Sequence, residues 1–145
     1  MISAREQTGV GKDEMKPFNL TSTYLRLRSD TSIESLPVDK TFWDRLTTGQ
    51  LGQFHHEYLV SSHTVDSDWS VWELHPNGDE VVCLLSGKVT LIFEHEDGDL
   101  AVELVEPGSF VVVPKGTWHT AKVHERAAML FITAGENTQH RAVKT

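Results

Sequence analysis

The sequence contains a single cysteine, Cys83, in 145 residues, so no disulfide can form within the chain. A lone thiol agrees with a reducing compartment. Long apolar runs are also missing: residues 110–113 and 127–132, among the longest, are far shorter than a membrane span. The first twenty residues are polar and lack the apolar stretch of a signal peptide. We therefore expect a cytoplasmic protein without a membrane segment.

Clusters of basic residues are absent as well. The chain has 13 Lys and Arg against 21 Asp and Glu, and its formal net charge is −8 at pH 7. No group of Lys or Arg can neutralise successive phosphates, so nucleic acid is not an expected partner. The acidity also disfavours an anionic membrane surface. Neither a nucleophile motif nor a cofactor motif is recognisable, an absence that favours a binding or sensor protein over an enzyme.

The composition is that of one folded domain, with 39% hydrophobic and 23% charged residues. Residues 1–20 mix polar residues without apolar periodicity and predict a flexible N-terminal arm. Residues 21–134 hold the expected domain, and residues 135–145 form a polar tail. Within the domain, residues 39–49 predict a short helix, because Asp39 can cap its start and a glycine can end it.

Most of the domain predicts short β-strands separated by turns. Alternation is clear from Lys88 to Glu94, where Val89, Leu91 and Phe93 share one face. The expected strands after the helix are residues 54–62, 69–75, 80–86, 88–95, 100–105, 110–113, 119–124 and 127–133. Glycine-containing turns separate several of them, one at Ser86-Gly87. Many short strands at near-regular spacing indicate an antiparallel barrel or sandwich.

The first candidate site segment is residues 72–87. Alternation along a strand points Glu73 and His75 to the same side. The turn at residues 76–79 then leads to a second strand, on which Glu80 can face back toward them. One hairpin thus presents three ligand-type side chains.

The second candidate segment is residues 108–119, where Pro114 ends a strand, Gly116 allows a sharp turn and His119 opens the next strand. Two imidazoles and a carboxylate suit Fe, Mn, Ni, Cu, Co or Zn. We predict that His75, Glu80 and His119 bind a divalent transition metal. The alternative is a metal-free domain that keeps these residues for turns and hydrogen bonds.

The two segments resemble the paired motifs of the cupin superfamily. The first motif has two histidines one residue apart, a glutamate and a glycine; it is matched by His75, Glu80 and Gly87, with Glu73 in the place of the first histidine. The second motif is matched in full by Gly108, Pro114, Gly116 and His119. The resemblance implies an all-β fold, a double-stranded antiparallel β-barrel of jelly-roll type, with the ligands inside. It also implies that many relatives are homodimers.

Glu73 is where the chain departs from the family pattern, and two roles remain open for it. As a fourth ligand, it would place two carboxylates and two imidazoles around the ion and make the metal a weaker Lewis acid. Outside the coordination sphere, it would serve as a general base or bind a metal-bound water. Without a cation, two inward carboxylates would repel each other.

We therefore predict a metal-dependent enzyme of oxygenase or isomerase type that acts on a small organic molecule, with Fe, Mn, Ni or Zn as cofactor and Glu73 as the catalytic residue. The alternative is a non-catalytic small-ligand or sensor barrel.

Aromatic residues that can line the cavity mouth, if they are not core packing, are Trp69, Trp118 and Phe110. His63 and His140 lie in polar surroundings and are expected in solvent. Outward apolar residues such as Trp72, Leu74 and Cys83 predict a covering layer, supplied by a second subunit.

Overall fold

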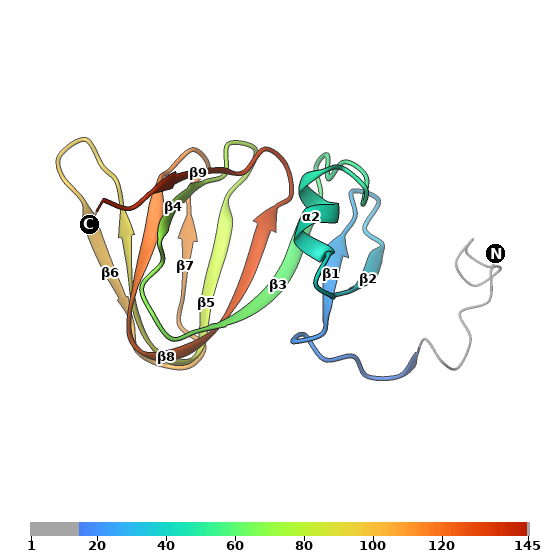
Figure 1. The fold of residues 1–145 in the computed structure, drawn as a ribbon, viewed down its shortest axis with the longest axis horizontal. Coiled ribbons are helices and arrows are strands. Elements are labelled where there is room, and N and C mark those ends of the chain that lie inside the picture. The colour runs from blue at the N-terminus through green and yellow to red at the C-terminus, as the bar shows by residue number, and fades with distance from the viewer. Residues whose placement is uncertain (1–14, 145) are drawn as a thin grey trace.

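The computed structural model describes residues 15–144, and its architecture is almost entirely β (Figure 1). The described part contains one short α-helix and nine strands in a single antiparallel sheet. In chain order the elements are β1 (Thr23–Leu27), β2 (Ile33–Pro37), α2 (Phe42–Thr47), β3 (Tyr58–Val65), β4 (Val71–Leu74), β5 (Glu80–Phe93), β6 (Leu100–Leu104), β7 (Phe110–Val113), β8 (His119–Ala134) and β9 (Gln139–Ala142). The all-β class is confirmed, and a short helix forms within the predicted residues 39–49, although its N-cap is Thr41 and not Asp39. Most of the expected N-terminal arm, residues 1–14, lies outside the described residues.

Two long strands, β5 and β8, organise the sheet because each takes part in both of its halves. In one half the strand order is β2-β1-β3-β8-β5-β7, built on the end of β8 and the start of β5. In the other half the order is β9-β4-β8-β5-β6, built on the start of β8 and the end of β5. The pairings among the described strands do not form a closed ring, so the fully closed barrel expected from the family resemblance is not shown.

A β-bulge replaces the turn predicted at Ser86-Gly87. The register between β5 and β8 shifts between Leu84 and Val89, and Gly87 adopts a φ of 87°. A Cβ at Gly87 would lie 2.1 Å from the backbone oxygen of Arg126, so only glycine fits there. The break predicted between residues 86 and 88 is therefore a bend within one 14-residue strand. The predicted strands at 119–124 and 127–133 are likewise a single strand, β8.

The main hydrophobic core lies between the two halves of the sheet. Alternate side chains of β5 and β8 point inward, so Val82, Leu84, Leu91 and Met129 are fully buried. Residues from before and after the Gly87 bulge belong to this one cluster. The two halves therefore share an interior, and side chains at the same end of that interior can form a site.

A second, smaller core packs α2 against β1 and β3, beside the main body (Figure 1). Phe42 of α2 is fully buried and meets the Tyr24 ring edge-on at a centroid distance of 5.2 Å.

No helix among residues 15–144 is long and apolar enough to cross a membrane.

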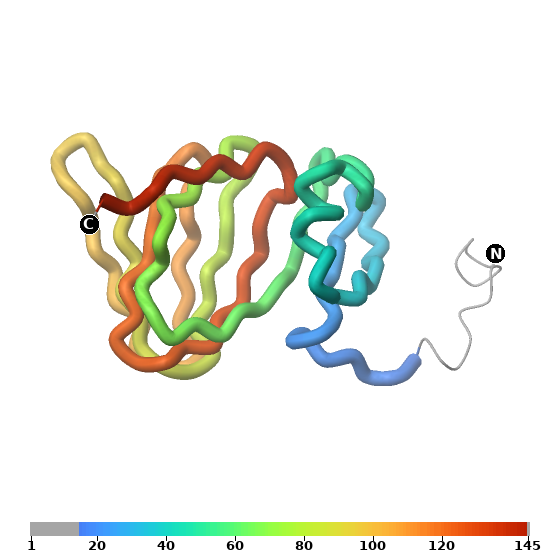
Figure 2. The backbone as a smooth tube through the Cα atoms, in the orientation of Figure 1, coloured from blue at the N-terminus to red at the C-terminus, as the bar shows by residue number. Residues whose placement is uncertain are grey.

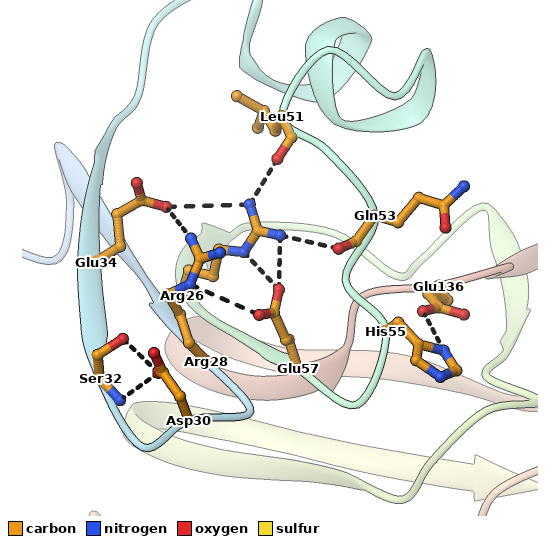
Figure 3. A network of polar contacts seen from close by, with 10 residues as sticks. All are labelled: Arg26, Arg28, Asp30, Ser32, Glu34, Leu51, Gln53, His55, Glu57 and Glu136. Carbon is orange, nitrogen blue, oxygen red and sulfur yellow. Dashed lines mark hydrogen bonds and ion pairs between the residues drawn. The ribbon is translucent and has the colours of Figure 1, made fainter.

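A buried arginine holds the loop that follows α2 (Figure 3). Arg26 donates hydrogen bonds to Glu57 at 2.7 Å and to the carbonyl oxygens of Leu51 and Gln53 at 2.5 and 2.9 Å. Its guanidinium also lies 4.1 Å from the centre of the Phe54 ring. These contacts connect β1 to the loop and limit the positions that α2 can take.

The C-terminal tail contains a strand that the sequence did not predict. In Figure 2 the end of the chain runs back across the sheet, and β9 pairs with β4 from Leu74↔Gln139 to Val71↔Ala142. The guanidinium of Arg141 lies 5.2 Å from the Trp72 ring, which gives this outward side chain part of its cover from the same chain.

Candidate metal centre

The structure brings the four predicted ligand residues together from three strands and one turn. Glu73 lies in β4, His75 follows the end of β4, Glu80 opens β5 and His119 opens β8. Glu73 and His119 are register partners on adjacent strands, so their side chains point to the same face. Each of the four residues offers one ligand atom, and these atoms all lie within 4.8 Å of one another.

Backbone contacts between two turns hold the two motifs side by side. The backbone N–H of Gly116 donates to the carbonyl oxygen of His75 at 2.9 Å. The N–H of Lys115 donates to the Asp79 carboxylate at 2.8 Å. Gly116 has a φ of 75°, a conformation that glycine adopts without steric cost. The glycine of the second motif thus fixes the turn of the first.

Glu80 lies at the centre of the group formed by Glu73, His75, Glu80 and His119, which we call the ligand cluster. Its two carboxylate oxygens are 3.0 Å from Nε2 of His119 and 3.2 Å from Nε2 of His75. A carboxylate oxygen of Glu73 is 3.4 Å from the same nitrogen of His75. His75, Glu80 and His119 are buried, whereas the Glu73 side chain keeps 26% of its surface exposed. Glu73 is therefore the member of the cluster that meets solvent.

Each buried member is oriented by a second hydrogen bond. His119 Nδ1 donates to the carbonyl oxygen of Thr117 at 3.1 Å; a carbonyl only accepts, so Nε2 is left with a lone pair when the ring is neutral. His75 Nδ1 lies 2.9 Å from the hydroxyl of Thr138, and the hydroxyl of Thr133 donates to Glu80 at 2.7 Å. Outer partners of this kind orient metal ligands. Spacing along the sequence gave no indication of Thr133 or Thr138.

The charges in the cluster depend on one another. Burial alone lowers the pKa of His75, but the carboxylates of Glu73 and Glu80 outweigh it and raise that pKa to about 9. Burial alone would raise the pKa of Glu80, yet the neighbouring His119 and His75 lower it to about 2. The site thus keeps a negative carboxylate and attracts a positive charge, either a proton on His75 or a cation.

A divalent metal ion fits these residues. His75 Nε2, His119 Nε2 and one oxygen of Glu80 are buried and have no correctly directed hydrogen bond. Leaving buried polar atoms unpaired costs about 1–3 kcal/mol each. Ligand atoms about 2.0–2.2 Å from one ion lie about 3 to 4.4 Å from one another, close to the observed separations. A transition metal would therefore satisfy all three atoms with little movement.

A cavity of about 690 Å³ lies beside the cluster, and Glu73, His75 and Glu80 form part of its wall. Of the three aromatic residues proposed for its mouth, only Trp69 lines it. Phe110 is 62% exposed on β7, and Trp118 packs under Arg141 with 4.7 Å between guanidinium and ring.

Two histidines that were expected in solvent line this cavity; the His140 side chain is indeed 53% exposed, whereas His63 is half-buried. His63 comes from β3. His140 comes from β9 and is the register partner of Glu73, with its Nε2 3.9 Å from a Glu73 oxygen. No local pattern predicted either position, because both depend on pairing between distant strands.

Residues 64–136 match the family model of the cupin domain, and the chain belongs to the cupin family. The match covers both site segments and excludes α2, β9 and most of β3. A search of curated proteins found no match.

Several solved structures are similar to part of this chain. A cupin superfamily protein from Desulfitobacterium hafniense is 27% identical, with a TM-score of 0.46 over 53% of this chain and 66% of that chain. A cupin-2 domain protein from Shewanella frigidimarina is 23% identical, with a TM-score of 0.44 over 53% of this chain and 70% of that one. A mutant of Bacillus subtilis oxalate decarboxylase is 17% identical, with a TM-score of 0.51 over 67% of this chain and 26% of that chain, which is a likeness of fold alone.

Proposed function

We propose that this cupin is a metal-dependent enzyme that acts on a small organic molecule in the cavity between the two halves of its jelly-roll sheet. The observation that carries the proposal is the position of the ligand cluster: three buried, unpaired ligand atoms converge on one point, and a partly exposed carboxylate connects that point to a cavity of about 690 Å³. A purely structural polar cluster would not need such an opening. Coordination by His75, Glu80 and His119 leaves positions free for a substrate.

We assign metal binding to His75, Glu80 and His119, and proton transfer to Glu73. Each of the first three has an outer hydrogen-bond partner, whereas Glu73 has none among the described residues and faces the cavity. A bound Fe, Mn, Ni or Zn ion would supply Lewis acidity or, for a redox metal, oxygenase chemistry. Glu73 would accept a proton from a hydroxyl or acidic C–H of a substrate in the cavity. Direct ligation by Glu73 is the other role open to it.

Metal analysis of the purified protein tests the proposal. Plasma mass spectrometry is expected to find close to one transition metal ion per chain, or the apo form is expected to take one up. Glu80→Gln should abolish this stoichiometry, since it removes the central charge. Failure of the apo protein to bind any of the four metals would overturn the proposal.

Glu73→Gln separates the two roles of Glu73. As a proton acceptor, Glu73 can be replaced with the metal content unchanged, while turnover of a substrate falls by about 10²–10⁴-fold. If Glu73 is a ligand, Glu73→Gln would weaken metal affinity by about 10–100-fold, the loss typical of removing an outer hydrogen-bond partner of a metal ligand. Chelator competition distinguishes these results without knowledge of the substrate.

A sensor barrel is the second candidate function. It is favoured by the apolar, aromatic character of the cavity wall, which suits tight retention of a ligand. Incubating the metal-loaded protein with small acids, diketones, thiols and aromatic alcohols, while following oxygen uptake and mass changes, separates the candidates. Tight binding without product supports the sensor.

We also propose that the chain forms a homodimer through β7. This strand pairs only with β5 among the described strands, so its other edge is free, and it exposes Phe110 and Val112 at 62% and 47%. A second copy can extend the sheet across that edge. Light scattering should report a dimer for the wild type and a monomer for Phe110→Glu; a wild-type monomer at micromolar concentration contradicts the proposal.

A further inference from the structure

One wall of the cavity is a continuous row of aromatic rings. Trp43 of α2 lies 5.5 Å from His63 of β3, with 32° between the ring planes. His63 lies 5.4 Å from Phe131, and Phe131 lies 6.0 Å from Trp69. All four rings line the cavity. Such spacings allow a planar guest to continue the offset or tilted packing of the row.

The row ends at the ligand cluster. The Trp69 ring centroid lies 6.1 Å from that of His119, and Glu73, His75 and Glu80 belong to the same cavity lining. A molecule packed against Trp69 and Phe131 would therefore have one edge next to the site and its opposite edge toward Trp43.

Away from the ligand cluster, the charged residues that line the cavity are acidic. Among the described residues that line it, none is Lys or Arg, and the acidic ones are Asp66, Asp68, Glu73 and Glu80. Burial lowers the pKa of His63, which disfavours a positive charge on its ring. Glu73 and Glu80 belong to the site. Of the two aspartates, Asp66 lies 3.3 Å from the guanidinium of Arg126, and Asp68 accepts a hydrogen bond from the N–H of Val123 and has no cationic partner among the described residues. An anion with its charge away from the metal therefore meets carboxylates and finds no Lys or Arg in the cavity lining.

The outer part of the row lies before the matched cupin segment. Trp43 and His63 precede residue 64, where the family match begins. Trp43 is held in place because its neighbour Phe42 is fully buried and because the Arg26 network restrains the loop after α2 (Figure 3). The N-terminal elements thus supply a cavity wall that the matched segment does not contain.

We propose that the ligand of this site is a planar aromatic molecule, neutral or positively charged, that packs along the row from Trp43 to Trp69 with its reactive group toward Glu73. The inference deepens the proposed function and names its substrate class. The ring row provides packing area, and the acidic residues reject aromatic anions such as sulfonates and phosphates.

Probe binding to the zinc-loaded and metal-free forms tests this inference. The probes are benzyl alcohol, benzylamine, benzenesulfonate and cyclohexylmethanol, and the readout is NMR of the four tryptophan indole N–H signals. The first two probes are expected to shift the signals of Trp43 and Trp69 and to leave those of Trp72 and Trp118 unchanged. Benzenesulfonate and cyclohexylmethanol are expected to bind about tenfold more weakly. Measurements on the metal-free form report whether the aromatic probe binds to the ring row even if the protein binds no metal. Failure of this inference can therefore be distinguished from failure of the proposed metal site.

Variants locate the binding. Trp69→Leu should weaken benzyl alcohol binding about tenfold with the zinc content unchanged, and Trp118→Leu, outside the cavity, should leave the affinity unchanged. Trp43→Leu, at a 42% exposed position, provides the same test if the first variant does not fold. Equal affinity for benzyl alcohol and cyclohexylmethanol, equal affinity for benzenesulfonate, or full affinity in both cavity variants would overturn the inference.

Discussion

Raising the pH of the metal-free protein from 6.5 to above 9 is expected to remove a stabilising interaction from the ligand cluster. The pKa of His75 is about 9 in the folded protein against an ordinary 6.5, because Glu73 and Glu80 favour its charged form despite burial. A group whose folded pKa is raised contributes its full stability below the unfolded pKa and loses it as pH rises through the folded pKa. Stability should therefore fall between pH 6.5 and about 9.

The expected size of this loss follows from the same values. At about 1.4 kcal/mol for each tenfold change in proton affinity, the interaction is worth about 3 kcal/mol. The lowered pKa of Glu80 describes the same contact from its other partner and is not added. Two other perturbed groups titrate outside the window, since burial raises the pKa of Tyr24 above 10.0 and lowers that of His63 below 6.5.

Urea unfolding of the chelator-treated protein at several pH values measures the effect. With a urea dependence of about 1–3 kcal/mol per molar, the midpoint should fall by about 1–3 M between pH 6.5 and 9. The metal-loaded protein should show no such fall, because a metal-bound His75 carries no proton to lose. His75→Gln should remove the pH dependence, and His95→Gln, at an exposed position, should keep it. A flat midpoint in the metal-free protein, or an unchanged slope in His75→Gln, would refute the reasoning.

Three further outcomes are expected. Gly87→Ala should destabilise the fold by at least about 3 kcal/mol in urea unfolding, since its Cβ would meet the backbone of the neighbouring strand. The control Gly98→Ala, at a positive φ with no neighbour within 4 Å, should cost about 1–2 kcal/mol. Similar losses for the two variants would show that the bulge is not tightly packed. Thr138→Val should weaken metal affinity about tenfold in chelator competition, and a change below about threefold would remove that hydroxyl from the site. Arg26→Met should cost about 3 kcal/mol because Glu57 stays buried with only the more distant guanidinium of Arg28, 3.7 Å away, to compensate its charge. Adding Glu57→Gln should recover part of this loss, and no recovery would contradict the pairing of Arg26 with Glu57.

The convergence of the candidate ligand residues was largely predictable because their relations are local. Alternation along one strand places Glu73 and His75 on one face, and the turn at residues 76–79 brings Glu80 back toward them. Gly116 marks the turn before His119 in the same way. Only the meeting of the two segments needed more than local rules, and the resemblance to the cupin motifs supplied it.

The bend at Gly87 shows the limit of local reasoning. A Ser-Gly pair between two alternating runs is a typical turn signal, yet β5 continues through it because β8 pairs with it on both sides of the bulge. Glycine is required at this position by the approach of a neighbouring strand. A single sequence contains no sign of that approach.

The sequence by itself determined the all-β class, the two turns and the ligand-type side chains, since each follows from side-chain periodicity and the conformational limits of glycine and proline over a few residues. Tertiary structure alone decided which other groups surround them. Thr138 reaches His75 across 63 residues of chain, His140 meets Glu73 through the pairing of β9 with β4, and Trp43 enters the cavity on a helix held by a separate core. These positions result from strand pairing and burial summed over the whole fold, so residues without any local signal surround the candidate ligands and line the cavity.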